Sequence, residues 1–228
     1  MQGDKFVRER ERLINRLIRE GILKDPKVIK AMLKVPREEF VPEKYKQHAY
    51  IDSPLPTLNG QTISAPHMVA MMCELLDLDV GHKVLEVGTG SGYHAAVCAE
   101  IVAPSDVDSK LWGHVYSIER VPRLAVFARN NLERTGYSDK VTVIVGDGTL
   151  GYSPAAPYDR ILVTAAAPNI PKPLIEQLAL NGRIVIPVGG TYYQELIVGV
   201  KISDSEIKTY SAGGCVFVPL IGRYGWRF

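Results

Sequence analysis

The sequence predicts an α/β protein built as a three-layer sandwich, with helices on both faces of a mostly parallel sheet. From residue 83 onward, short apolar segments such as KVLEV, VYSIE and VTVIV alternate with longer helical segments. The apolar segments are continuous, as in strands that are covered on both faces. A glycine-rich turn, GTGSG, follows the first of them and leads into a helix, and open α/β sheets bind ligands at such turns.

The N-terminal part is predicted to be helical. Apolar residues recur at helical spacing over residues 5–20. Asp25 and Pro26 then begin a second helix, and an irregular stretch covers residues 41–61. We expect residues 1–61 to form an extension of helices and loops that covers the functional site.

A third helix starts in the segment TISAPHMVAMM, residues 62–72. Ser64 can cap the first amides of this helix, and Pro66 is tolerated in its first turn. This structural explanation is sufficient unless the rest of the chain supplies a site for the helix to face.

The remaining elements alternate in the order expected of a parallel sheet. Strands are predicted at 83–87, 115–119, 141–145, 159–165 and 182–188, with helices at 92–103, 122–135 and 173–180 between them. After residue 188 the helices cease. Residues 194–202 and 213–221 are strand-like, so the sheet should finish with an antiparallel pair.

Length and composition indicate one domain, spanning residues 1–228. The 228 residues are 46% hydrophobic and 23% charged, which suffices for a sizeable core, and no repeat or linker divides them. The formal charge of +2 argues against a protein that binds duplex nucleic acid through its phosphates. Without a signal peptide or an apolar run of about 18 residues, we expect a cytoplasmic protein that does not contact membranes.

Three cysteines, Cys73, Cys98 and Cys215, lie far apart in apolar sequence. Their number and spacing fit neither a disulfide framework nor a CxxC metal site. We therefore expect buried thiols and no metal site.

The glycine turn is the first candidate for a binding site. Gly88, Gly90 and Gly92 allow a ligand to approach the backbone and the following helix, although close packing alone can also require glycines. Dinucleotide sites have the spacing GxGxxG, and Tyr93 stands here in place of the third glycine. A ligand without a pyrophosphate fits better.

Two further strand ends carry acidic groups. Glu119 ends the second strand, where a carboxylate can accept hydrogen bonds from both hydroxyls of a ribose. Asp147 and Gly148 follow the third strand. Because the carboxyl ends of adjacent parallel strands share one edge, these groups and the glycine turn predict a pocket for an adenosine-bearing molecule.

Several sequence blocks together resemble the protein-L-isoaspartate O-methyltransferases, a family of S-adenosylmethionine-dependent Rossmann-like enzymes. The blocks are PLPTLNGQTISAPHM, VLEVGTGSGY, VYSIER, GDG, YDRILVTAAAP, NGRIVIPVG and FVPL, in the family's order. The resemblance implies a seven-stranded sheet with a reversed last strand. It also implies methyl transfer from S-adenosylmethionine, leaving S-adenosylhomocysteine, to the free α-carboxylate of L-isoaspartyl residues in damaged proteins and peptides, which initiates repair.

The resemblance further implies roles for individual residues. Ser64 is placed at the reacting carboxylate as the catalytic residue, and Thr62, His67 and Val218 are assigned to substrate binding with it. Cofactor contacts fall on Glu86, Gly88, Thr89, Gly90, Gly92, Glu119, Asp147 and Gly148. Many relatives have a second histidine where this chain has Val69, so that histidine is not required here. Residues 104–113 look like an insertion that lengthens a surface connection or serves assembly, and the oligomeric state is left open.

An isoaspartyl carboxylate has a pKa near 3.5 to 4 and is ionised at neutral pH, so the reaction needs positioning rather than a base. Ser64 and the helix amides behind it can orient such an anion. Three alternatives stay open: a dehydrogenase, disfavoured by the GxGxG spacing; a nucleotide-binding module, which needs no Ser64 segment; and an RNA or small-molecule methyltransferase, which only the resemblance disfavours.

Overall fold

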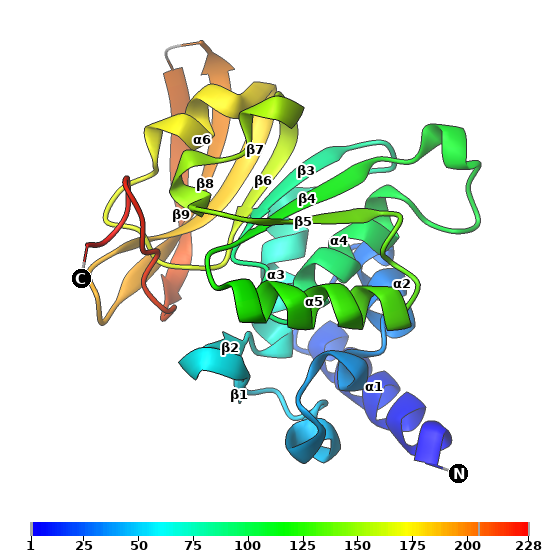
Figure 1. Cartoon of the computed structure of the whole chain (residues 1–228). Helices are drawn as coiled ribbons and strands as arrows, with labels where there is room; N and C mark the ends of the chain where they lie inside the picture. Colours follow the sequence, from blue (N-terminus) through cyan, green and yellow to red (C-terminus); the bar gives the residue numbers. More distant parts are fainter. Residues whose placement is uncertain (1, 205, 228) are drawn as a thin grey trace.

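A seven-stranded sheet forms the centre of the protein (Figure 1). The structure, a computed structural model, describes residues 2–204 and 206–227. The strand order is β5-β4-β3-β6-β7-β8-β9. The strands are β3 (Lys83–Val87), β4 (His114–Glu119), β5 (Val141–Val145), β6 (Tyr158–Val163), β7 (Leu178–Gly189), β8 (Gln194–Ser203) and β9 (Glu206–Cys215).

The first five of these strands are parallel, and β8 pairs antiparallel with both β7 and β9. The predicted α/β fold with an antiparallel end is therefore confirmed, and the reversed strand is β8. The two strands that follow β3 in the chain, β4 and β5, lie on one side of it, and β6 and the later strands lie on its other side. Such a switch point leaves a crevice at the carboxyl ends of the strands.

Helices cover both faces of the sheet. On one face, α3 (Pro66–Leu76), α4 (Tyr93–Val102) and α5 (Pro122–Arg134) share a buried apolar cluster with side chains of the sheet. On the other face, α6 (Lys172–Gln177) contributes to a second cluster. The two clusters, separated by the sheet, make the predicted three layers.

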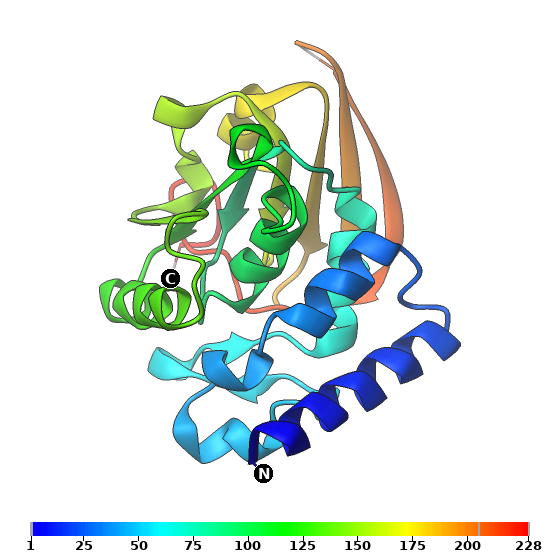
Figure 2. The same cartoon turned by 90° about the vertical axis from the view of Figure 1, so that its right-hand side faces the viewer.

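The N-terminal helices form an outer layer. Figure 2 shows α1 (Gln2–Arg19) and α2 (Pro26–Lys34) outside α3 and α4, and buried side chains of both join the larger apolar cluster. Asp25 caps α2 as predicted, since its carboxylate accepts from the amide of Lys27 at 2.7 Å. Short 3₁₀ helices and a short hairpin, β1 (Leu55–Pro56) with β2 (Thr62–Ile63), then lead to α3.

Two predicted boundaries are wrong. Helix α6 ends at Gln177 instead of residue 180, because Leu178 is already extended and pairs with Tyr158 at the start of a longer β7. The last strand is β9, not residues 213–221. Because β9 is an edge strand with mostly exposed side chains, its sequence carries no apolar run, and the apolar run that follows it has another role.

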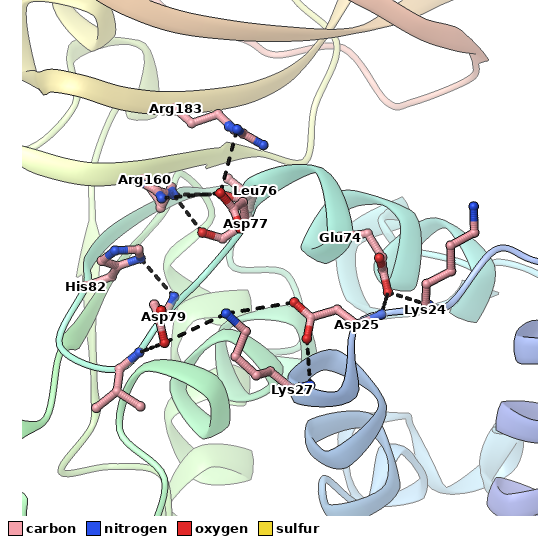
Figure 3. Close-up of polar contacts among 11 residues, drawn as sticks. Lys24, Asp25, Lys27, Glu74, Leu76, Asp77, Asp79, His82, Arg160 and Arg183 are labelled. Atoms are coloured by element: carbon pink, nitrogen blue, oxygen red, sulfur yellow. Dashed lines mark hydrogen bonds and ion pairs between the residues drawn. The ribbon is translucent and has the colours of Figure 1, made fainter.

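The edge of the sheet at the amino ends of the strands is closed by polar contacts (Figure 3). Arg160 Nε donates to the carbonyl oxygens of Leu76 (2.7 Å) and Asp77 (3.1 Å). Arg183 Nη1 donates to the carbonyl oxygen of Leu75 (2.9 Å). Both guanidinium groups therefore satisfy the last carbonyls of α3, where cations are favoured.

Residues 104–113 form a connection at the surface between α4 and β4. The indole of Trp112 donates to the carbonyl oxygens of Pro104 (2.9 Å) and Val107 (3.0 Å), which folds the segment onto itself. Within the part of the chain that the structure describes, no helix is long and apolar enough to cross a membrane.

Candidate functional site

Two cavities adjoin at the carboxyl ends of the strands. The first, here called the strand-end cavity, has a volume of about 270 Å³ and is lined by Glu119, Gly148 and their neighbours. The second, the α3 cavity, has a volume of about 530 Å³ and is lined by Ser64, His67 and their neighbours. Both are bordered by the same five residues, Thr62, Gly88, Gly90, Thr164 and Val218. The cavities thus meet at the glycine turn.

The glycine turn brings backbone to the cavity wall. Gly88 has a φ of +100°, and a Cβ at this position would lie 2.3 Å from Thr164 Oγ1. The Thr164 hydroxyl donates to the Gly88 carbonyl at 2.7 Å and fixes the turn. Thr89 lines the α3 cavity, whereas Gly92 lines neither cavity. Gly92 instead lets α4 pack against α5, because a Cβ there would lie 3.2 Å from Leu132 Cγ.

Glu119 is a buried carboxylate in the wall of the strand-end cavity. Its Oε2 accepts from the Gly90 amide at 3.0 Å, and its Oε1 accepts from the Val121 amide at 2.9 Å. These two bonds hold the carboxylate in place. Each oxygen keeps a further lone pair for a ligand hydroxyl.

Glu86 and Asp147 do not line either cavity. Glu86 is fully buried and accepts a hydrogen bond from the Ser117 hydroxyl, and burial raises the pKa of Glu86 to about 7. The carboxylate of Asp147 accepts from the amides of Thr149 (2.9 Å) and Arg223 (2.8 Å). In the structure these acids hold the protein's own backbone and side chains, and their contact with a cofactor stays a prediction.

The predicted helix cap at Ser64 is wrong. Helix α3 begins at Pro66, and its N-cap residue is Ala65, which makes no side-chain capping bond. Asp52 supplies the cap instead, because its Oδ1 accepts from the His67 amide at 2.9 Å. The amides of Met68 and the residue after it both donate to the Ala65 carbonyl. The first amides of α3 are therefore already bonded, and the expectation that they orient an anion is not supported.

Ser64 faces the α3 cavity and is half-buried. Within the described residues its hydroxyl has no hydrogen-bond partner, whereas its carbonyl accepts from Arg37 Nη2 at 2.8 Å. Arg37 is buried, also donates to the Ala49 carbonyl, and places its guanidinium 4.9 Å from the ring centre of Tyr93. Burial lowers the pKa of Arg37. Arg37 thus fixes the backbone of Ser64 and leaves its hydroxyl free for a ligand.

His67 also lines the α3 cavity, and its imidazole is oriented by residues that do not belong to α3. Its Nδ1 is 2.9 Å from Asp52 Oδ1, and Asp52 Oδ2 is 3.2 Å from Arg16 Nη2. The chain Arg16–Asp52–His67 joins α1, a loop and α3. Sequence reasoning missed Arg16, Arg37 and Asp52, because each acts through a partner at least 12 residues away and no spacing pattern marks them.

The apolar run after β9 forms the wall between the two cavities. The Ala166 amide donates to the Val218 carbonyl at 2.8 Å, and the Leu220 amide returns a bond to Ala166 at 2.8 Å. Val218, predicted to bind substrate, borders both cavities. The segment predicted as a strand therefore crosses the strand ends instead of extending the sheet.

The electrostatic character of the two cavities differs. The strand-end cavity presents the carboxylate of Glu119. Within the described residues, the lining of the α3 cavity includes hydroxyl and imidazole groups but no acidic side chain. The first cavity suits a ligand with hydroxyl donors, and the second suits an anion such as a carboxylate.

The floor of the α3 cavity includes His94. His94 Nε2 lies 3.3 Å from Cys73 Sγ on the neighbouring helix. A hydrogen bond with Cys98 lowers the pKa of the Cys73 thiol. All three cysteines are buried and free, as the sequence predicts.

Comparisons with known proteins give one family. A sequence profile of the protein-L-isoaspartate(D-aspartate) O-methyltransferases matches residues 8–225. A protein-L-isoaspartate O-methyltransferase of Hyperthermus butylicus is 62% identical over 99% of this chain and 94% of its own length. One of Staphylothermus marinus is 58% identical over 98% of both chains.

A solved structure agrees with these sequence relatives. It is a Plasmodium falciparum protein named as a protein-L-isoaspartate O-methyltransferase, in complex with S-adenosyl-L-homocysteine. It is 30% identical, its TM-score is 0.82, and the match covers 93% of this chain and 98% of that one.

Proposed function

The chain belongs to the protein-L-isoaspartate(D-aspartate) O-methyltransferase family, and we propose that its two adjoining cavities divide the reaction between cofactor and substrate. The enzyme transfers a methyl group from S-adenosylmethionine to the free α-carboxylate of L-isoaspartyl residues in proteins and peptides. One observation carries the assignment of the cavities: they meet at the glycine turn, and only the strand-end cavity presents a carboxylate.

The residues of the strand-end cavity fit the adenosine part of S-adenosylmethionine. Glu119 is fixed by two backbone amides, so its remaining lone pairs are aimed where ribose hydroxyls would donate. At Gly88 the absence of a side chain leaves backbone at the wall, and a Cβ would collide with Thr164. When bound, S-adenosylmethionine supplies an electrophilic methyl group.

The residues of the α3 cavity would hold the substrate. Its carboxylate is ionised at neutral pH, so no group has to remove a proton. The Ser64 hydroxyl is free to donate to one carboxylate oxygen. His67 has its Nδ1 occupied by Asp52, which leaves Nε2 as the ring nitrogen for a second contact. Catalysis is then a matter of holding the carboxylate in line with the methyl group.

Selection of the isomerised residue follows from the same positioning. In L-isoaspartate the free carboxylate is attached to the carbon that bears the amide nitrogen, and in L-aspartate it is one methylene further out. If the peptide backbone is held while Ser64 fixes the carboxylate, the wrong isomer places its oxygen about one bond length off line. A misplacement of about 1 Å can cost about a hundredfold in rate.

The test uses two synthetic peptides that differ only in this linkage, each with radiolabelled S-adenosylmethionine. We expect labelling of the L-isoaspartyl peptide and about a hundredfold less labelling of the L-aspartyl peptide. Equal labelling of both would reject the proposed selection by the α3 cavity. Labelling of neither, with S-adenosylmethionine still bound in calorimetry, would point to another methyl acceptor.

A further inference from the structure

Three potential metal ligands lie together beneath the α3 cavity. They are Cys73 on α3 and His94 and Cys98 on α4, and one ligand atom of each lies within 4.8 Å of the other two. All three side chains are buried. The reaction proposed above uses none of them. We propose that they bind a thiophilic divalent ion of the Zn²⁺ class, which ties α3 to α4.

The spacing of the donor atoms is close to what such an ion requires. Tetrahedral zinc with bonds of about 2.3 Å to sulfur and about 2.0 Å to nitrogen places sulfur and nitrogen ligands about 3.5 Å apart, and two sulfurs about 3.8 Å apart. Cys73 Sγ and His94 Nε2 lie 3.3 Å apart. The remaining separations, at most 4.8 Å, close with side-chain movements of about 1 Å.

The backbone already presets two of the ligands. His94 and Cys98 are four residues apart on α4, so their side chains project from the same helix face. An i, i+4 pair is a recurrent arrangement of metal ligands on helices. The third ligand comes from the buried face of α3. This pair, HAAVC in the sequence, is a signal that reasoning from CxxC spacing alone overlooked.

The chemistry of the cluster favours an ion over a purely apolar core. Two thiolates neutralise a divalent cation, which removes the cost that an unpaired buried charge would carry. Binding releases the two thiol protons. Within the described residues, His94 Nδ1 and Glu86 Oε1 are both buried without a hydrogen-bond partner. A metal-bound histidine commonly donates its second ring N–H to a carboxylate.

A disulfide between Cys73 and Cys98 is the main competing arrangement. It would use two of the three clustered groups and leave unexplained why the imidazole of His94 contacts Cys73. The ion accounts for all three. The bound ion would also link α3, which follows Ser64, to α4, which follows the glycine turn. It would thereby fix the positions of the two cavities relative to each other.

The test is a Co²⁺ titration of the reduced, metal-free full chain under anaerobic conditions, followed by displacement with Zn²⁺. We expect one equivalent of Co²⁺ with a thiolate-to-cobalt charge-transfer band that Zn²⁺ abolishes. Cys73→Ser, Cys98→Ser and His94→Asn should each weaken binding at least about tenfold. Cys215→Ser is the matched control, because Cys215 is buried near the same cavity but outside the cluster, and it should bind Co²⁺ like the wild type.

Three results would overturn the proposal. The first is that the wild type binds no stoichiometric Co²⁺, and the second is that the thiolate band is lost in Cys215→Ser but kept in Cys98→Ser. The third is a Cys73–Cys98 disulfide in the purified chain, combined with no Co²⁺ binding after reduction. Should the cluster variants fail to fold, X-ray absorption of the Zn²⁺-loaded wild type decides. Two sulfur ligands and one imidazole nitrogen are expected, and a shell of oxygen ligands alone would contradict the site.

Discussion

The two ends of the sheet use polar groups in opposite ways. At the amino ends of the strands, Arg160 and Arg183 donate to the last carbonyls of α3. Both guanidinium groups also lie near the carboxylate of Asp77 (Figure 3). At the carboxyl ends, Ser64 and Glu119 line cavities, and the Ser64 hydroxyl has no protein partner within the described residues. Polar groups at the first end satisfy each other, whereas those at the second keep bonding capacity for a ligand.

Helix α3 shows this difference within a single element. Its last carbonyls are bonded by arginines, and its terminal residue Asp77 adopts the left-handed conformation of a helix end. At its first turn, the cap comes from Asp52 in a distant loop rather than from the adjacent Ser64. A capping serine would have its oxygen committed to the helix, so the cap from Asp52 leaves the Ser64 hydroxyl free to bind a ligand.

The largest effect on cofactor binding is expected at Glu119. Glu119→Ala removes a charged acceptor from the strand-end cavity, and such hydrogen bonds contribute about 1.5 to 3 kcal/mol. S-adenosylmethionine affinity measured by calorimetry should therefore fall about ten- to a hundredfold. Unchanged affinity in a folded variant would mean that Glu119 serves only the turn, through Gly90 and Val121.

A substitution at the amino ends of the strands should lower the stability of the protein without changing methyl transfer. Arg160→Ala removes a guanidinium that bonds two carbonyls at the end of α3, which should cost about 1 to 2 kcal/mol of unfolding free energy. The midpoint of thermal unfolding would fall by about 2 to 8 °C. Methyl transfer per folded molecule should match the wild type. A loss of turnover without a loss of stability would break the division between the two ends.

A third effect, a pH dependence, is expected at Glu86. Burial raises the pKa of Glu86 to about 7, above the ordinary value of 4.5. The folded state then binds more protons than the unfolded state, so stability from this group is present below about pH 4.5 and is lost as pH rises through about 7. Glu86→Gln keeps an acceptor for Ser117 and removes the titration. Its stability relative to the wild type should rise by about 2 to 3 kcal/mol between about pH 5 and about pH 8 in urea unfolding, and a constant difference would contradict this.

The sequence predicted the elements whose side chains contact many neighbours. Strands β3 to β6 carry short apolar runs, and α3, α4 and α5 begin within two residues of their predicted starts. The edge strand β9 was misplaced because its exposed side chains carry no apolar signal. The apolar run after it has the composition of a strand, but its Val218 lines both cavities and the run does not extend the sheet.

The sequence predicted those site residues that stand next to a recognisable element, such as the end of a strand. The glycine turn and Glu119 stand directly at strand ends, and both reach a cavity as predicted. Asp52 lies in an irregular stretch and Arg37 in a short 3₁₀ helix. Both act on the α3 segment from a distance in sequence, so only the tertiary structure reveals them. The cap at Ser64 failed for the same reason, because a side chain distant in sequence took the position that local propensity assigned to the serine.

The most direct test of the account compares Ser64→Ala with Asp25→Ala, a loss of the true cap of α2. For each variant, the rate of methyl transfer to an L-isoaspartyl peptide and the free energy of unfolding are measured. We predict that Ser64→Ala lowers the rate about a hundredfold and changes stability by less than about 0.5 kcal/mol. Asp25→Ala should lose about 1 kcal/mol and keep its rate. If Ser64→Ala instead loses about 1 kcal/mol of stability and methylates at the wild-type rate, Ser64 serves the helix and the account is wrong.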